Sequence, residues 1–286
     1  MQWEGGEESA NVEDRRGGIG PTHIIGGGSI LVLIIGYFLG VDPRQLLYQM
    51  EDQSAQSAPQ ATQVAPGQED RPRKFIGTIL GYTEKVWTAQ FQKMGRVYEK
   101  PKLVIFDQEV SSACGETSSA VGPFYCPYDR TVYIDPSFYN ELSSRLGGSK
   151  ADFSQAYVLA HEIGHHVQLL LGYAAIADEK RRQLPKEEFN RWSVRLELQA
   201  DYLAGVWAHY GQEQFHFIEK GDLEEALKSA NAIGDDKLQQ KFNGRISPQN
   251  YTHGTSAQRA KWYRMGFETG DISELKAIFE MPYDQL

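Results

Sequence analysis

Residues 160–168 read Ala-His-Glu-Ile-Gly-His-His-Val-Gln, and this stretch decides how the rest of the chain is interpreted. At about 100° of rotation per residue, a helix here brings His161, His165 and Gln168 to within about 60° of one another. The opposite face carries the apolar side chains of Ala156, Leu159, Ile163, Val167 and Leu170. The pattern therefore predicts a helix with one face in the core and the other face available for chemistry.

The spacing of two of these histidines suits a metal ion. Imidazoles at positions i and i+4 lie one turn apart, so ring nitrogens of His161 and His165 are able to reach one zinc ion at roughly 2.0–2.1 Å. Glu162 projects sideways from the same turn and is placed to take a proton from a water molecule without being a ligand. His166 is rotated by about 100° and is expected on the surface or beside a ligand. Because the motif also arises by chance on solvated helices, the interpretation needs a third ligand.

A second helical pattern, from about 185 to 210, contains two candidates for that third ligand. Glu197 and Asp201 lie one turn apart on it. The residues that flank them on this face are small, namely Ala204, Gly205 and Ala208. They would let this helix approach the first one closely, so that Glu197 completes a His/His/Glu site and Asp201 accepts a hydrogen bond from a ligand histidine. The alternative is that both carboxylates pair with Arg191 or Arg195 on a solvated face.

Three stretches, taken in order, resemble the bacterial neutral zinc metallopeptidase family. They are residues 161–168, residues 197–205 (Glu-Leu-Gln-Ala-Asp-Tyr-Leu-Ala-Gly) and residues 253–259 (His-Gly-Thr-Ser-Ala-Gln-Arg). The likeness covers roughly residues 1 to 283. It implies a zincin-like domain of the gluzincin kind, in which the third ligand is a glutamate.

The resemblance also assigns roles to residues. It implies that His161, His165 and Glu197 hold one Zn²⁺ ion and that Glu162 is the general base. The implied activity is hydrolysis of a peptide or protein substrate. Two other functions stay open: a zinc-binding adaptor that keeps the metal for stability, which has no need of Glu162, and an enzyme that uses iron in the same set of ligands.

The third stretch follows Tyr251 and opens a helix over residues 256–267, with Thr255 as its N-cap. In related zincins a histidine or tyrosine outside the metal-binding helices hydrogen-bonds the oxyanion of the reaction, so His253 or Tyr251 is a candidate for this role. The alternative is that His253 only holds the loop in place and that Arg259 pairs with a buried acid.

The remaining pattern indicates an α+β fold, mostly helical with a small sheet. Residues 83–98 have helical spacing, residues 103–106 and 131–134 predict short strands, and helical patterns follow. Strands followed by helices are typical of α+β domains. We expect one metallopeptidase domain over residues 73–286, with strand 131–134 as the sheet edge that binds an extended peptide.

The first 72 residues differ in character from this domain. Residues 1–23 are rich in Gly and Glu and predict a disordered arm. Residues 24–40 are apolar and uncharged and predict a transmembrane signal anchor, with a cleaved signal peptide or a buried helix as alternatives. Residues 41–72 predict a flexible tether. Because Arg15 and Arg16 precede the span, we expect a cytoplasmic tail and a catalytic domain on the other side of the membrane. The resemblance to a bacterial family implies that this is the inner (cell) membrane, with the domain on the periplasmic or extracytoplasmic side.

Charge and cysteine content exclude two further classes. The net charge of −9 argues against a nucleic-acid partner, because binding phosphates requires a basic face. With only Cys114 and Cys126, a four-cysteine zinc ribbon is excluded. These two residues form either a disulfide, which would stiffen the rim of the substrate site, or two free thiols.

Overall fold

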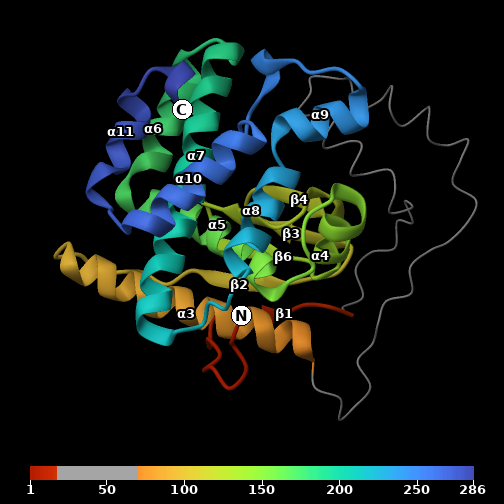
Figure 1. Cartoon of the computed structure of the whole chain (residues 1–286), viewed down its shortest axis with the longest axis vertical. Helices are drawn as coiled ribbons and strands as arrows, with labels where there is room; N and C mark the ends of the chain where they lie inside the picture. The colour runs from red at the N-terminus through yellow and green to blue at the C-terminus, as the bar shows by residue number, and fades with distance from the viewer. Residues whose placement is uncertain (18–69) are drawn as a thin grey trace, which may run out of the picture.

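The computed structural model describes residues 1–17 and 70–286 (Figure 1). The strands are β1 (Val12–Asp14), β2 (Lys102–Ile105), β3 (Glu109–Ser112), β4 (Gly115–Ser118), β5 (Phe124–Cys126) and β6 (Thr131–Ile134). The helices are α3 (Arg71–Lys93), α4 (Ser137–Glu141), α5 (Asp152–Leu171), α6 (Tyr173–Gln183), α7 (Lys186–Phe215), α8 (Asp222–Ala232), α9 (Asp235–Asn243), α10 (Ser256–Thr269) and α11 (Ala277–Glu280). Single turns complete the set, namely η1 (Ser119–Val121), η2 (Leu142–Leu146), η3 (Pro248–Asn250), η4 (Ser273–Lys276) and η5 (Tyr283–Gln285). This part of the chain is mostly helical with a small sheet, as predicted.

The main sheet has four strands in the order β1-β2-β6-β5. The first three strands are parallel, and β5 is antiparallel to β6. All four residues of β6 are buried, because Thr-Val-Tyr-Ile lies between two neighbouring strands. The prediction that residues 131–134 form the edge of the sheet is therefore wrong. A run of this kind without apolar and polar alternation is typical of a central strand, and the edges here are β1 and β5.

Residues 1–17 pack against the domain, so the prediction of a disordered arm is wrong for this part of residues 1–23. Trp3 is only 3% exposed, and its Nε1 donates to Asp152 at 2.7 Å. β1 pairs with β2, which supplies the arm with backbone partners that its own sequence does not reveal. Gly81 of α3 allows the close approach, because a Cβ there would lie 2.6 Å from the carbonyl oxygen of Glu7.

The docked arm also bears on the topology expected for the chain. The proposed span, residues 24–40, lies outside the described residues, as does the tether up to residue 69. Arg16 forms ion pairs with Asp14 and with Asp70, so the two described ends of this segment lie next to each other. A single crossing would put residues 1–17 and the domain on opposite sides of a membrane, which contradicts their shared sheet. No helix in the described part of the chain has the length and apolar character that a membrane crossing needs.

Helix α3 begins and ends earlier than the predicted helix over residues 83–98. Asp70 caps its N-terminus by accepting from the backbone N–H of Arg73 at 3.1 Å, and Pro72 lies in the first turn. Proline is favoured there because its missing N–H would have no helical partner. The end of the predicted tether is thus the start of a helix.

Glycines bring the helices that carry the site into close contact. A Cβ on Gly164 of α5 would lie 2.9 Å from the carbonyl oxygen of Ala200 on α7. A Cβ on Gly205 of α7 would instead lie 2.1 Å from the carbonyl oxygen of Tyr263 on α10. The prediction that Gly205 faces the first metal-binding helix is therefore wrong. The small residues serve two interfaces, and α7 lies between α5 and α10 with a close contact to each.

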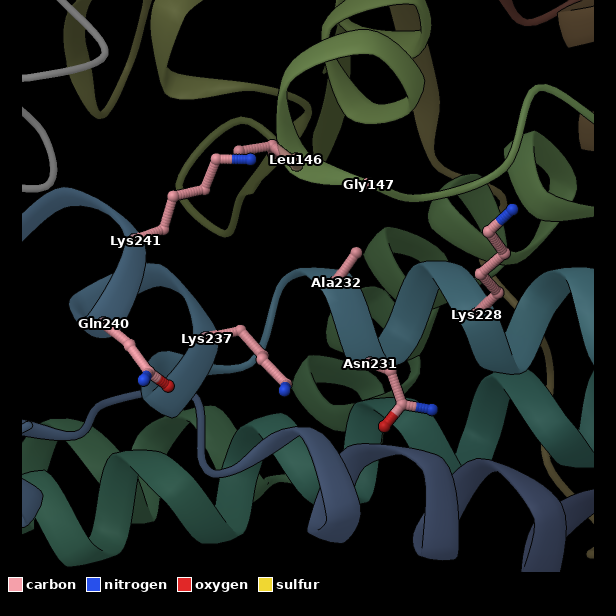
Figure 2. A pocket seen from close by; sticks show the side chains of 8 residues that line it. All are labelled: Leu146, Gly147, Lys228, Asn231, Ala232, Lys237, Gln240 and Lys241. Atoms are coloured by element: carbon pink, nitrogen blue, oxygen red, sulfur yellow. The ribbon is translucent and has the colours of Figure 1, made fainter.

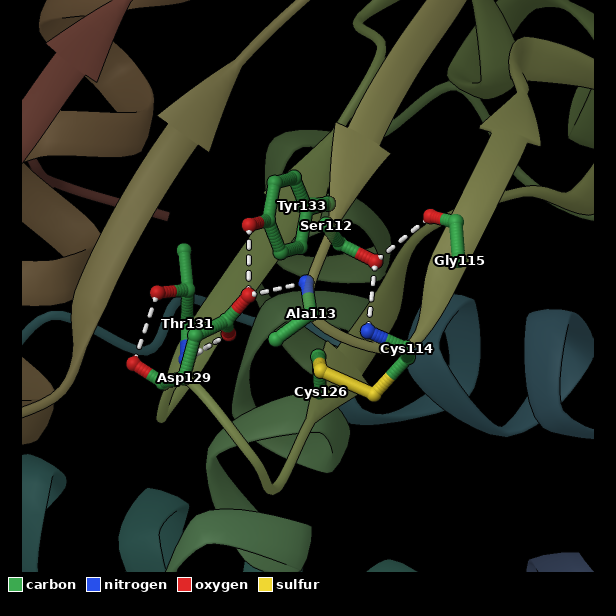
Figure 3. Close-up of a disulfide and its surroundings, with 8 residues drawn as sticks. All are labelled: Ser112, Ala113, Cys114, Gly115, Cys126, Asp129, Thr131 and Tyr133. Atoms are coloured by element: carbon green, nitrogen blue, oxygen red, sulfur yellow. Dashed lines mark hydrogen bonds between the residues drawn. A yellow bond between two sulfur atoms is a disulfide. The ribbon is translucent and has the colours of Figure 1, made fainter.

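Of the two states left open for the cysteines, the structure contains the disulfide (Figure 3). Cys114 lies in the turn between β3 and β4, and Cys126 is the last residue of β5. Asp129 reinforces this junction, because its Oδ2 accepts from the backbone N–H of Ala113 and from the hydroxyl of Tyr133, both at 2.9 Å. The β3–β4 hairpin is thereby tied to the edge strand of the main sheet.

Candidate metal centre

Three predicted ligands meet between α5 and α7. Three potential ligand atoms lie within 4.8 Å of one another, one each from His161, His165 and Glu197. Nε2 of His161 is 3.2 Å from Oε2 of Glu197, and Nε2 of His165 is 3.6 Å from Oε1 of the same carboxylate. Two imidazole nitrogens and one carboxylate are the donor set of a catalytic zinc site, in which water takes the fourth position.

Asp201 lies behind His161, on the side away from the other ligands. Its Oδ1 is 2.9 Å from Nδ1 of His161 and also accepts from the hydroxyl of Tyr157 at 2.6 Å. An ionised carboxylate only accepts hydrogen bonds, so Nδ1 of His161 carries a hydrogen and Nε2, which faces Glu197, is the nitrogen that is left to bind a metal ion. The arrangement is the one expected for Asp201 from the sequence, with Tyr157 as an additional partner.

The carboxylates dominate the electrostatics of this site. Burial alone would lower the pKa of His161, but Asp201 and Glu197 raise it to about 10. Burial would raise the pKa of Glu197, yet the neighbouring His165 and His253 hold it well below the usual range. A metal ion that binds here must therefore displace a proton from His161.

Glu162 lies beside the ligands and is 8% exposed. Its carboxylate makes no hydrogen bond to any residue that the structure describes. Burial raises its pKa, although the two adjacent histidines of the site act in the opposite direction. A carboxylate that is free of protein partners and more basic than usual is suited to accept a proton from water.

His253 lies in the loop between η3 and α10, and Asp235 holds this loop. Oδ2 of Asp235 accepts from the backbone N–H groups of Thr252, His253 and Gly254 at 2.8, 2.7 and 3.0 Å. Its Oδ1 is 3.3 Å from Nδ1 of His253. Asp235 is a residue that sequence reasoning missed, because nothing in the pattern connects the start of α9 with a loop 18 residues later.

The two candidates for contact with the oxyanion, His253 and Tyr251, differ in their electrostatic surroundings. Burial would lower the pKa of His253, but Glu197 and Asp235 raise it, so the ring interacts with a metal ligand. Tyr251 is 5% exposed, and burial together with Asp236 and Asp235 raises its pKa to about 12. The electrostatic link to Glu197 distinguishes His253 from Tyr251.

The alternative partners for the carboxylates of α7 are engaged elsewhere. Arg195 donates to the backbone carbonyls of Ile278 and Met281, and Arg191 lies over the ring of Tyr283 at 5.4 Å. Glu197 therefore does not pair with these two arginines on a solvated face. Arg259 does pair with a buried acid, as one alternative predicted, and that acid is Asp201.

His166 is a buried structural residue, neither on the surface nor at the metal centre. Its Nε2–H donates to the carbonyl of Glu99 at 2.6 Å, and its Nδ1 accepts from the hydroxyl of Tyr125 at 2.8 Å. Burial lowers the pKa of this ring to about 4. The side chain joins α5 to the edge strand β5, next to the ligand His165.

A cavity of about 510 Å³ lies between η2 and helices α8 and α9 (Figure 2). Its lining includes the exposed lysines Lys228, Lys237 and Lys241. None of its lining residues is a candidate ligand or a partner of one. We therefore assign it no part in the metal centre.

The chain is similar to proteins from several bacteria. It is 47% identical over 286 residues to the uncharacterized protein YpfJ of Escherichia coli, covering 96% of this chain and 97% of the relative. It is 37% identical over 249 residues to the uncharacterized protein Rv2575 of Mycobacterium tuberculosis, covering 82% of this chain and 81% of the relative. No solved structure matches it significantly. The model of the family described as "Putative neutral zinc metallopeptidase" matches residues 1–278, and the chain belongs to this family.

Proposed function

We propose that this protein is a zinc-dependent endopeptidase with a gluzincin-type site. The observation that carries the proposal is the convergence of His161, His165 and Glu197 beside the free carboxylate of Glu162. A zinc site that serves only stability is usually closed by four protein ligands and has no need of an adjacent base. The family and the donor set both support zinc as the metal.

When bound, zinc would polarise the carbonyl of the scissile bond and lower the pKa of a water molecule towards about 7. Glu162 would accept a proton from the attacking water and return it to the leaving amine. His253, held by Asp235, would donate a hydrogen bond to the developing oxyanion. We favour His253 over Tyr251 because its ring interacts electrostatically with Glu197.

We further propose that an extended peptide binds along the edge of β5, which is the last strand of the main sheet in the described part of the chain. We assign peptide binding to β5 instead of to residues 131–134, because residues 131–134 lie inside the sheet. The link between Tyr125 and His166 holds β5 beside the helix that carries the ligands. Edge strands bind peptides through backbone hydrogen bonds, so this mode would restrict side chains at alternate positions only.

The experiment that tests the function is Glu162→Gln in the full chain. Zinc content should stay at that of the wild type, because Glu162 is not a ligand. Cleavage of a peptide library should fall by about 100- to 10,000-fold, the usual contribution of a general base. Glu187→Gln, at an exposed position in the first turn of α7, is the matched control and should cleave like the wild type.

The outcomes separate the competing functions. A wild-type protein that binds zinc but cleaves no peptide in the library supports the adaptor function. A Glu162→Gln variant that cleaves as fast as the wild type overturns the proposed mechanism. Metal analysis of protein purified without added ions separates zinc from iron in the same ligand set.

A further inference from the structure

We propose that Gln168 positions His165 for metal binding, as the last member of a chain of amide groups that starts at the backbone carbonyl of Leu275. The inference rests on the metal centre of the proposed function. Gln168 lies one turn after His165 on α5 and is 3% exposed. The sequence places Gln168 on the same helix face as His165 but predicts no hydrogen bond between the two side chains.

The hydrogen bonds of Gln168 determine which way its amide group faces. Its Nε2 donates to the backbone carbonyl of Leu196 at 2.7 Å and to Oε1 of Gln199 at 2.9 Å. A backbone carbonyl only accepts, so the NH₂ group of Gln168 must point towards it. The carbonyl oxygen Oε1 is then the atom that faces Nδ1 of His165, at 2.9 Å.

That orientation fixes the tautomer of the ligand. Because Oε1 of Gln168 accepts, Nδ1 of His165 must carry the hydrogen. Its Nε2 then keeps a lone pair, and this is the nitrogen that lies 3.6 Å from Oε1 of Glu197. The other tautomer of His165 would place a hydrogen on Nε2, where a metal ion needs a lone pair.

Gln199 extends the chain of amides by one more step. Its Nε2 donates to the backbone carbonyl of Leu275 at 2.8 Å, so its Oε1 faces Gln168. Gln199 is 1% exposed, and each of its bonds in this chain is therefore shielded from competing water. Leu275 belongs to η4, so the C-terminal segment helps to orient a ligand that lies 110 residues earlier in the sequence.

The two histidine ligands are thus oriented by different kinds of hydrogen-bond acceptor. Asp201 is a charged acceptor behind His161, whereas His165 has a neutral amide whose direction depends on acceptors beyond it. Loss of such a partner typically weakens metal binding about 10- to 100-fold. We expect this loss of metal affinity when Gln168 is replaced. The loss should be smaller when Gln199 is replaced, because Gln168 then keeps its hydrogen bond to the carbonyl of Leu196.

The test measures zinc affinity of the full chain by competition with a chelator. Gln168→Leu and Gln168→Met should each bind zinc about 10- to 100-fold more weakly than the wild type. Gln199→Leu should lie between them and the wild type. Gln90→Leu is the matched control, because Gln90 is a buried glutamine of α3 that has no bond to the site, and its zinc affinity should be unchanged.

A second measurement needs no variant. In ¹⁵N-histidine-labelled metal-free wild type, NMR should show the hydrogen of His165 on Nδ1. Wild-type zinc affinity in a folded Gln168 variant, or a neutral His165 ring that carries its hydrogen on Nε2 and none on Nδ1 in the wild type, overturns the proposal. Neither readout depends on catalysis, so a protein that binds zinc but cleaves nothing would refute the proposed function and leave this inference intact.

Discussion

Arg259 on α10 donates two hydrogen bonds to Asp201 on α7, from Nε to Oδ2 at 2.8 Å and from Nη2 to Oδ1 at 3.0 Å. Both side chains are buried, at 3% and 0% exposure. Oδ1 of Asp201 also accepts from His161 and Tyr157. The acid that orients a metal ligand is therefore itself held by a cation from a third helix.

Arg259→Met should destabilise the protein by about 3–5 kcal/mol, because it removes a buried cation that donates two hydrogen bonds to the buried carboxylate of Asp201. Urea denaturation of the metal-free protein measures this loss. The double variant Asp201→Asn with Arg259→Met should recover part of the stability, since it removes the unpaired charge. A loss below about 1 kcal/mol for the single variant would mean that solvent or Tyr157 already compensates the carboxylate.

The ligands could be predicted from the sequence because their geometry is local. Helical periodicity places His161 and His165 one turn apart, and the same rule pairs Glu197 with Asp201. The N-cap at Thr255 could also be predicted, and the structure contains it as a capping box with Gln258. In each case the relevant partner lies within four residues, so the pattern carries the information.

The support of the site could not be predicted because it depends on distant partners. An isolated glutamine gives no sign of its orientation, and that of Gln168 follows from Leu196 and from Gln199. Asp235 likewise acts through a loop that reaches it only in the folded chain. The order of residues 1–17 could not be predicted for the same reason, because β1 is ordered by the edge of β2 and not by any periodicity of its own.

Trp3→Ala should release the arm from the domain. Replacing a buried Trp by Ala typically costs about 3–5 kcal/mol, and here the hydrogen bond to Asp152 is lost as well. We expect faster hydrogen exchange at the amides of β1 and faster proteolysis within residues 1–17. Glu4→Ala, at an exposed position, is the control and should leave both rates unchanged. Unchanged exchange in the Trp3 variant would show that backbone pairing alone holds the arm.

The shared sheet of β1 and β2 makes a prediction about membrane topology. Attachment to a membrane through residues 24–40 is a proposal that rests on their apolar sequence. Whether or not it occurs, the arm and the domain must lie on the same side. Glu4→Cys and Val97→Cys, both at exposed positions, should therefore react alike with a membrane-impermeant maleimide in intact cells that express the full chain. Opposite labelling would mean that the arm is not docked in the membrane-bound protein.

The disulfide should stabilise the β3–β4 hairpin, which it joins to β5. A bridge over a sequence separation of 12 residues contributes about 3 kcal/mol by the loop-entropy estimate. The double variant Cys114→Ser with Cys126→Ala should lose about that much stability in urea denaturation and should no longer respond to a reducing agent, whereas the wild type should.

Because Asp129 still accepts from the backbone of Ala113, the β3–β4 hairpin should loosen rather than unfold, and hydrogen exchange should rise there more than in α5. Zinc affinity should not change, since neither cysteine contacts the metal ligands; a variant that loses zinc would instead tie the hairpin to the metal centre.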